Sequence, residues 1–310
     1  MLQSIWDDVK REFNYGNMVT RIIIINVAVF VLLNIVKLAL YIGNGGTLPP
    51  FYFDFLHFFC MAANWKEFLT HPWGIFTSMF LHEGPWHLLW NMLFLYWFGR
   101  IVGDFIGNQR ILPIYVLGGL VGAIFFFTSV NLLPYNADYA LGASAGVMAI
   151  LVAAGTISPD YIMRLLFLGD VKLKYIVGFL VFLDLILIPN GGNTGGHFAH
   201  LGGAFFGWVY VKQLRQGTDW AVPVNQFFDA ISNFFINLFK GQQRGPKVVY
   251  KNPNRQAEKQ KRERRQNRPN SHSDLSHQEQ VDAILDKIKK SGYDSLSPEE
   301  KEFLFNASKK

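Results

Sequence analysis

Six apolar segments of nearly membrane-spanning length constrain what this chain can fold into. As a helix, a segment needs roughly 20 apolar residues to cross a bilayer core of about 30 Å, and about 17 can suffice. Segments that approach or meet this length lie near residues 20–42, 86–103, 111–133, 141–157, 174–189 and 196–213. The sequence therefore predicts an all-α, polytopic membrane protein with six transmembrane helices.

The composition agrees with this fold class. Half of the 310 residues are hydrophobic and only 17% are charged, whereas about a quarter of the residues in an average soluble domain are charged. A disordered chain is thereby excluded. The single cysteine, Cys60, cannot form an internal disulfide. The fold therefore depends on burial in lipid or in a core, and we expect Cys60 to be an unreactive apolar filler.

The basic residues predict how the chain crosses the membrane, because cytoplasmic connections are enriched in Lys and Arg. With the N-terminus inside, the outer connections contain only Lys66, whereas the inner ones contain Arg100, Arg110, Arg164, Lys172 and Lys174. We therefore expect both termini on the cytoplasmic side of a bacterial inner membrane. The aromatic segment 43–85 is expected to pack at the outer interface.

The predicted membrane domain, residues 18–213, is flanked by four other parts. Residues 1–17 and 222–240 have apolar side chains at helical spacing and predict helices that lie along the membrane surface. Residues 241–275 are polar and basic and predict a disordered linker. We expect this basic tail to contact anionic lipids. Nucleic acid is not expected as a partner, because no recognised fold or aromatic platform accompanies the charge.

Residues 276–310 predict a small helical hairpin. Ser276–Glu279 and Ser297–Glu300 both fit the capping box that begins a helix, and Gly292 can end the first helix. A core of about 33 residues is marginal by itself. We therefore expect the hairpin to dock on a partner that the sequence does not identify, or on the membrane domain.

Polar side chains inside the predicted spans are the candidates for function, because they are costly in lipid. They are His87, Asn91, Ser144, Asp184, His197 and His200. At about 1.5 Å per residue, Ser144, His200 and the pair His87 and Asn91 all lie within about 10 Å of the outer surface. Three spans thus bring a hydroxyl, imidazoles and an amide to one depth.

These groups are sufficient for acyl transfer. The Ser144 hydroxyl needs a base within hydrogen-bond reach, and His200 can supply it. A tetrahedral oxyanion needs fixed donors, which Asn91, His87 and the Ser144 backbone can supply.

Glycines indicate close helix packing around these groups. Gly203 and Gly207 follow His200 at GxxxG spacing, which allows the sixth span to press against the fourth. Gly142 flanks Ser144 in a similar way.

At this point the sequence resembles the rhomboid intramembrane serine proteases. The resemblance covers about residues 18–213 and rests on three motifs in the family's order: His87-Leu-Leu-Trp-Asn91, Gly142-Ala-Ser144 and Ala199-His200-Leu-Gly-Gly203. It implies a rhomboid-like bundle that cleaves membrane-spanning protein substrates near the outer membrane face.

The resemblance also implies a role for each candidate residue. Ser144 is the implied nucleophile, His200 the general base, and His87 and Asn91 surround the oxyanion, with no metal or other cofactor. A dyad without a third acid is implied, so Asp184→Asn is expected to retain substantial activity. Asp184 is then expected to face the water-filled cavity or to serve a substrate gate on the fifth span.

Two positions depart from the family pattern, and one further segment is expected to move. Gly74 stands where many members have arginine, and Met148 stands at a position that is often aromatic and stacked on the catalytic histidine. The glycines among residues 191–196 suit a mobile flap over the site.

Other readings of the same residues remain open. A catalytically inactive rhomboid-like protein could bind membrane segments for trafficking or degradation, although such a protein would normally have lost the serine or the histidine. A metal could bind the histidines at 57, 71, 82, 87, 197 and 200, but Pro85 breaks the helical turn that an HExxH motif requires. The Gly142–Gly146 match to the GxSxG elbow is discarded, because that motif needs a preceding strand.

Overall fold

The computed structural model describes residues 2–166, 168–190, 192–239 and 277–307. The chain divides into two compact units, residues 1–241 and 242–310. Helices dominate the described residues of both units, and the strands among these residues are two to four residues long. The predicted all-α class is therefore confirmed. The expectation for the linker, residues 241–275, lies outside the described residues.

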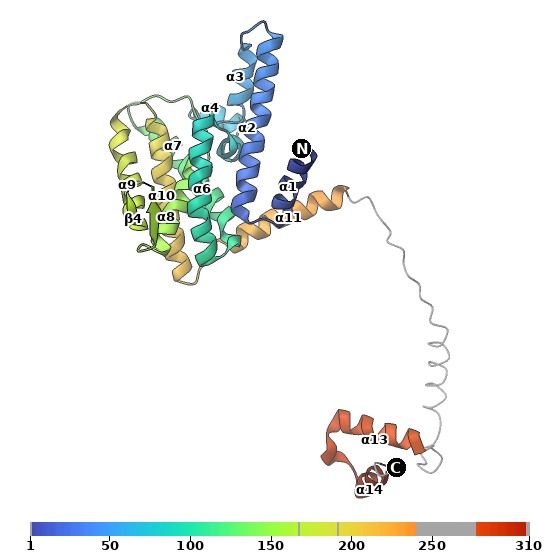
Figure 1. Cartoon of the computed structure of the whole chain (residues 1–310). Helices are drawn as coiled ribbons and strands as arrows, with labels where there is room; N and C mark the ends of the chain where they lie inside the picture. Colours follow the sequence, from blue (N-terminus) through green and yellow to red (C-terminus); the bar gives the residue numbers. More distant parts are fainter. Residues whose placement is uncertain (1, 167, 191, 240–276, 308–310) are drawn as a thin grey trace. The chain divides into compact units, whose positions relative to one another are not determined.

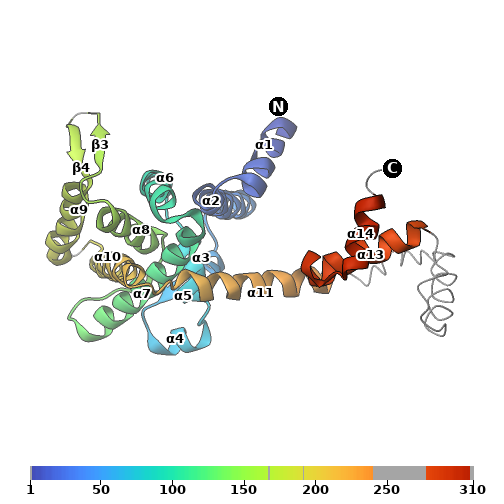
Figure 2. The ribbon, with the colours of Figure 1, turned by 90° about the horizontal axis from the view of Figure 1, so that it is seen from below.

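Each of the six predicted apolar segments is a helix in the first unit. They are α2 (Met18–Gly43), α6 (Pro85–Ile106), α7 (Ile111–Leu132), α8 (Ser144–Ile157), α9 (Leu173–Leu187) and α10 (Thr194–Arg215). Helices α7, α8 and α10 pack against one another at the centre of the unit, and α6 covers α8. Figure 2 shows this cluster end on, with α9 at its edge and α2 beyond α6.

Length and composition alone qualify two of the described helical segments as membrane-spanning. They are Met18–Gly43, with mean hydropathy 2.6, and Asn108–Leu132, with mean hydropathy 2.1. Helix α8 is apolar but has only 14 residues, and α6 and α10 contain the polar candidate residues. Six membrane crossings therefore remain a prediction, although the six helices are present.

Helix α2 has the surface of a lipid-facing helix. Large apolar side chains along it are exposed, among them Val31, Leu32, Ile35, Leu38 and Ile42. Exposed apolar surface on this scale is unfavourable in water. Its N-terminus is fixed locally, because the Asn17 side chain caps it by accepting from the Thr20 amide, and Asn108 Oδ1 accepts from the Met18 amide.

Residues 44–84 form short elements that pack beside the bundle. They are α3 (Pro50–His57), β1 (Met61–Ala62), α4 (Trp65–Thr70), α5 (Gly74–Thr77) and the 3-10 helix η1 (Ser78–Phe80). Strand β1 pairs antiparallel with β2 (Tyr139–Ala140), so Met61 opposes Ala140. This pairing fixes the chain that leads into α8.

Two sequence expectations fall in this segment. Cys60 is buried, and burial, with Glu83 adding to it, raises the pKa of its thiol to about 12, so the thiol is unreactive. Gly74 lies against the Cys60 backbone, where a Cβ would come within 2.1 Å of the carbonyl oxygen. An arginine at position 74 is therefore incompatible with this local packing.

The elements that were expected on the inner side gather at one end of the bundle. Helices α1 (Leu2–Tyr15) and α11 (Ala221–Phe239) lie at the end where α2 begins, as does the hairpin of β3 (Ile162–Leu165) and β4 (Gly169–Lys172) (Figure 1). An ion pair of 2.7 Å between Arg110 and Asp219 joins the start of α7, through η2 (Asn108–Arg110), to the α10–α11 connection. Helix α11 exposes Phe227, Ile231, Phe234, Phe235 and Leu238, which suits a helix at a membrane surface.

The second unit contains α13 (His277–Ser291), the 3-10 helix η5 (Tyr293–Ser295) and α14 (Pro298–Ala307). The second capping box is formed, because the Glu300 amide donates to Ser297 Oγ and Glu300 Oε2 accepts from the Ser297 amide. Ser276, from the first capping box, lies outside the described residues. Gly292 follows α13 with φ +79°.

Candidate active site

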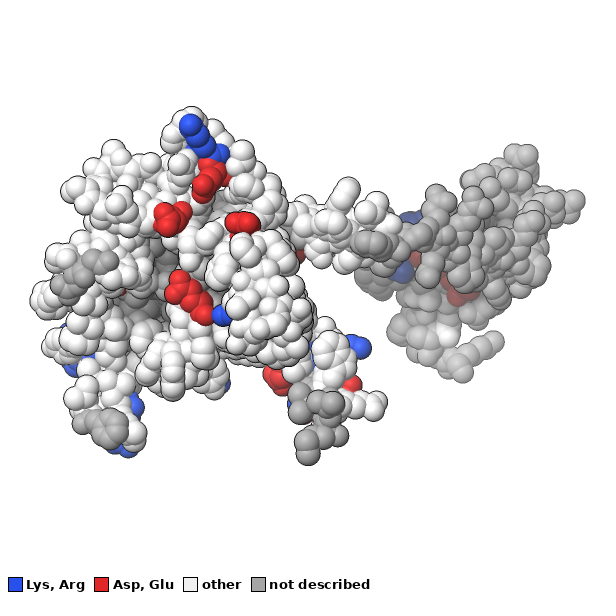
Figure 3. All heavy atoms as spheres, turned by 90° about the horizontal axis from the view of Figure 1, so that it is seen from above, with Lys and Arg blue, Asp and Glu red and all other residues white. Residues whose placement is uncertain are grey.

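A cavity of about 970 Å³ brings six of the sequence-predicted site residues together. It lies where α6, α8 and α10 begin and α9 ends. Its lining includes His87, Asn91, Gly142, Ser144, Asp184 and His200. Figure 3 looks down on this end of the first unit and shows a hollow among mainly uncharged side chains, with acidic groups near it. Glu83 and Asp138 line the same cavity.

Ser144 is the first residue of α8, and the backbone before it is fixed. Gly142 has φ +130°, a conformation that favours glycine, and its amide donates to the carbonyl oxygen of Ser78 over 2.9 Å. A Cβ at position 142 would lie 2.9 Å from the His87 ring and 3.6 Å from Ser144 Oγ. Glycine is therefore required for His87 and Ser144 to share this corner of the cavity.

The start of α8 also supplies hydrogen-bond donors. The first backbone amides of a helix have no intrahelical acceptor, and the helix dipole favours negative charge there. The Ser144 amide is one of these groups. An oxyanion beside Ser144 would therefore meet a favourable field.

Close packing brings His200 to the same place. A Cβ on Gly203 would lie 2.0 Å from the carbonyl oxygen of Ala145, and one on Gly207 would lie 2.1 Å from that of Ala149. Helix α10 therefore approaches α8 at backbone contact directly after Ser144 and one turn after His200.

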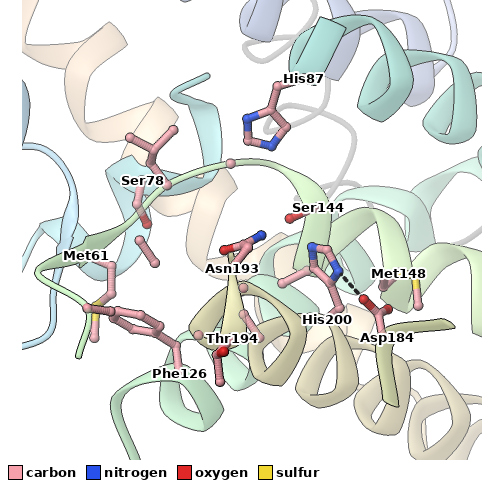
Figure 4. Close-up of a pocket in the computed structure, with 18 of the residues that line it drawn as sticks. Met61, Ser78, His87, Phe126, Ser144, Met148, Asp184, Asn193, Thr194 and His200 are labelled. Carbon is pink, nitrogen blue, oxygen red and sulfur yellow. Dashed lines mark hydrogen bonds and ion pairs between the residues drawn. The ribbon is translucent and has the colours of Figure 1, made fainter. Parts of the chain in front are cut away.

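The Ser144 hydroxyl and the His200 ring line the same cavity, as Figure 4 shows. Among the hydrogen bonds of the described residues there is none between these two side chains. In hydrolases this bond is often long before substrate binds and tightens in the complex.

The two expected oxyanion donors enter from α6. Asn91 is buried, and its Nδ2 donates to the carbonyl oxygen of His87 over 2.8 Å, which leaves the second amide proton of Asn91 for another acceptor. The His87 ring is half-buried and borders Gly142. Both residues line the cavity with Ser144.

Asp184 has partners that the sequence pattern did not predict. The Nδ1 atoms of His200 and His197 lie 2.8 Å and 2.7 Å from its Oδ1. A signal for this contact was present in the sequence. Asp184 lies at the outer end of one span and both histidines at the outer start of the next, and only a short connection separates them.

Other cavity residues were not singled out individually from the sequence. Asn193, just before α10, lies beside Ser144 and His200 (Figure 4). Thr194 also lines the cavity, and its Oγ1 donates to the carbonyl oxygen of Ile188 over 2.9 Å. Asn193 and Thr194 belong to the glycine-rich segment that was expected to form a flap, of which Gly191 lies outside the described residues. Met148 is buried and lines the cavity near His200 and Asp184.

The donor groups also bear on the metal hypothesis. In the described ranges, the set of three or more side chains that could hold a metal ion is Asp184, His197 and His200, whose ligand atoms all lie within 4.8 Å of one another. His57 and His71 contact aromatic rings instead. The oxygen–nitrogen distances of 2.7 and 2.8 Å in the Asp184 set are those of hydrogen bonds.

Two parts of the chain match known family models. Residues 69–216 match the family model of the rhomboid domain, and residues 272–310 match a family of unknown function (DUF6576).

Three relatives illustrate the range of similar proteins. The chain is 27% identical to RHOMBOID-like protein 12, mitochondrial, of Arabidopsis thaliana, over 59% of each chain. It is 30% identical to Rhomboid protease GluP of Bacillus subtilis, over 43% of this chain and 25% of that one. It is 28% identical to Inactive RHOMBOID-like protein 8 of Arabidopsis thaliana, over 50% of this chain and 44% of that one. The chain thus spans between a quarter and three fifths of the length of these relatives.

Proposed function

Because the chain belongs to the rhomboid family, an integral membrane family that includes both proteases and inactive members, we propose that it is an intramembrane serine endopeptidase. The observation that carries this proposal is the meeting of Ser144, at the N-terminus of α8, with His200 in one cavity, where backbone contact between α8 and α10 holds them.

The proposed reaction is peptide-bond hydrolysis in two steps. Ser144 Oγ attacks the substrate carbonyl carbon while Nε2 of His200 takes the hydroxyl proton. The same proton then passes to the leaving amine, and an acyl-enzyme remains. Water, deprotonated by His200, hydrolyses the ester and restores Ser144.

The oxyanion of both steps needs donors, and three are at hand. They are the Ser144 amide, the free Asn91 amide proton and the His87 ring. Preorganised donors of this kind contribute about 3–4 kcal/mol each when removed one at a time.

The proposed substrates are membrane-spanning proteins. A backbone that is satisfied within a helix cannot enter a protease site extended, so cleavage is expected near the outer end of a span, in a locally unwound stretch. Trp86, Trp90 and Phe94 line the cavity along α6, and this apolar wall suits a segment that arrives from lipid.

The proposed location is a bacterial inner membrane with both termini on the cytoplasmic side. The bias of Lys and Arg supports this orientation, and one of the relatives is a bacterial protein. Other relatives have mitochondrial names, so recovery in a mitochondrial membrane is the alternative outcome of cell fractionation.

The test compares single variants of the full-length chain in proteoliposomes. Ser144→Ala and His200→Ala should each abolish cleavage of a model transmembrane substrate and labelling by a fluorophosphonate. The double variant should lose no more, because the two residues act as a unit. Ser158→Ala, at the opposite end of the same helix, and His57→Ala, at an exposed position, are the matched controls.

Two results would overturn the proposal. Normal cleavage by Ser144→Ala would remove the nucleophile. A folded wild-type chain that binds membrane segments but neither cleaves them nor reacts with the fluorophosphonate would be an inactive rhomboid-like binding protein, like the Arabidopsis relative named as inactive.

A further inference from the structure

Asp184 makes contacts that the proposed dyad does not use. It lies near the end of α9, and its side chain is almost fully buried, with 7% of the residue exposed. Its Oδ1 lies 2.8 Å from Nδ1 of His200 and 2.7 Å from Nδ1 of His197. Figure 4 shows the first contact on the side of His200 that faces away from Ser144.

At these distances the Asp184 carboxylate is hydrogen-bonded to Nδ1 of each imidazole. An ionised carboxylate only accepts hydrogen bonds, so both imidazoles donate from Nδ1. In neutral His200 the proton on Nδ1 leaves Nε2 with a free lone pair. This is the tautomer that a general base towards Ser144 requires.

The surroundings of His200 supply little other charge. The titratable groups that face it are Asp184 from α9, His197 from α10 itself and His87 from α6. Helices α7 and α8 contain no acidic or basic residue. In this part of the described structure, Asp184 is the carboxylate that touches the ring.

We propose, on the basis of the proposed peptidase function, that Asp184 is a positioning residue that completes a Ser144–His200–Asp184 triad. It holds His200 in the Nδ1–H tautomer and stabilises the imidazolium that forms when His200 accepts the Ser144 proton. His197 is the second donor to the same oxygen and keeps the carboxylate turned towards His200. This expectation is opposite to the one that the family resemblance gives for Asp184→Asn.

The roles of tautomer control and of simple packing are separated by comparing two substitutions. Asparagine has the shape of aspartate, so a packing role predicts that Asp184→Asn is milder than Asp184→Ala. The asparagine amide, however, can donate to Nδ1 and leave the proton on Nε2, where it blocks the base. Tautomer control therefore predicts that Asp184→Asn loses at least as much activity as Asp184→Ala.

The experiment uses the full chain in proteoliposomes and measures the rate of fluorophosphonate labelling and the kcat/KM of peptide cleavage from pH 5 to 9. Asp184→Asn should lose about 10³–10⁴-fold at neutral pH, and Asp184→Glu should recover part of the rate. His197→Gln, which leaves the His200 contact in place, should lose only severalfold.

A second measurement does not depend on activity. Nitrogen NMR of histidine-labelled protein, compared with His200→Gln for assignment, should show a protonated Nδ1 in wild type and a changed tautomer in Asp184→Asn. It also shows whether each variant is folded.

Several outcomes would overturn the inference. A folded Asp184→Asn with wild-type rate and pH profile would do so while leaving the peptidase proposal intact. Loss of wild-type cleavage on chelation, with rescue by zinc, would reassign Asp184, His197 and His200 to a metal site. If wild-type Ser144 does not react at any pH while NMR shows the Nδ1–H tautomer, the peptidase proposal fails and the contact is structural only.

Discussion

Substituting Gly203 by alanine perturbs the contact that brings the two proposed catalytic helices together. A Cβ at position 203 would lie 2.0 Å from the carbonyl oxygen of Ala145, whereas a close carbon–oxygen contact needs about 3.3 Å. The helices α8 and α10 must therefore separate locally by about 1.3 Å, the difference between these distances. Overpacking of this kind costs about 1–3 kcal/mol of stability.

The displacement falls on the reacting groups. Ala145 directly follows Ser144, and Gly203 lies one turn after His200. Because a misplacement of about 1 Å can cost on the order of 10²-fold in rate, Gly203→Ala should lower kcat/KM about 10²-fold. Gly207→Ala has a similar clash, 2.1 Å from the Ala149 carbonyl, but one turn farther from the site, so it should lose similar stability and much less rate.

The assay measures thermal unfolding together with fluorophosphonate labelling and substrate cleavage well below the unfolding temperature. Gly178→Ala in α9 is the matched control, because a Cβ there would meet no atom within 4 Å and the helix gains up to about 1 kcal/mol from alanine. The reasoning is refuted if Gly203→Ala matches Gly178→Ala in rate and stability, or if Gly207→Ala loses as much rate as Gly203→Ala.

Four further predictions follow from the same structure. Asn91→Ala should lower kcat about 10²–10³-fold, less than loss of the nucleophile, since it removes one oxyanion donor; single-turnover cleavage measures this. Burial, with neighbouring His87 adding to it, lowers the pKa of His82 to about 4, so the unfolded chain binds a proton that the folded chain does not. Thermal stability should then fall by up to about 3 kcal/mol as pH drops from about 6.5 to 4, and His82→Leu should flatten that profile. In sealed vesicles, cysteines placed at exposed Gly43 and Thr218 should react with an impermeant maleimide from opposite sides, because the native cysteine is buried and does not react. Labelling of both from one side would contradict the topology. A chain ending after residue 245 should cleave the model substrate within severalfold of the full-length rate, and complete loss would make the tail part of the catalytic fold.

The sequence predicts the helices of the first unit well, because one physical requirement dominates them. A run of apolar residues long enough for lipid is a local property, visible in α2 and α7 without any knowledge of their neighbours. The second capping box is local as well, since Ser297 and Glu300 lie three residues apart and satisfy each other. Such features need no tertiary information.

The contacts of the candidate site depend on relations between helices, which the sequence predicts only in part. Depth along each span placed Ser144 and His200 at one level, and glycine spacing indicated which helix faces contact each other. Neither argument gives the rotation of α9 about its axis, and that rotation directs Asp184 towards His200 and His197. A short connection between two spans limits how far apart their ends can be, but side-chain direction is set by packing.

The shortness of α8 connects this geometry to the chemistry. A helix of 14 residues is about 21 Å long, whereas a bilayer core is about 30 Å thick. If α8 ends at the inner boundary of the core, Ser144 lies below the outer surface, and the remaining depth above it is filled by the β2 segment and the start of α10 rather than by α8. Irregular backbone at membrane depth is tolerated where it lines a water-filled cavity, and hydrolysis needs that water as a reactant. The same truncation that exposes the first amides of α8 to an oxyanion therefore also lets water reach the acyl-enzyme.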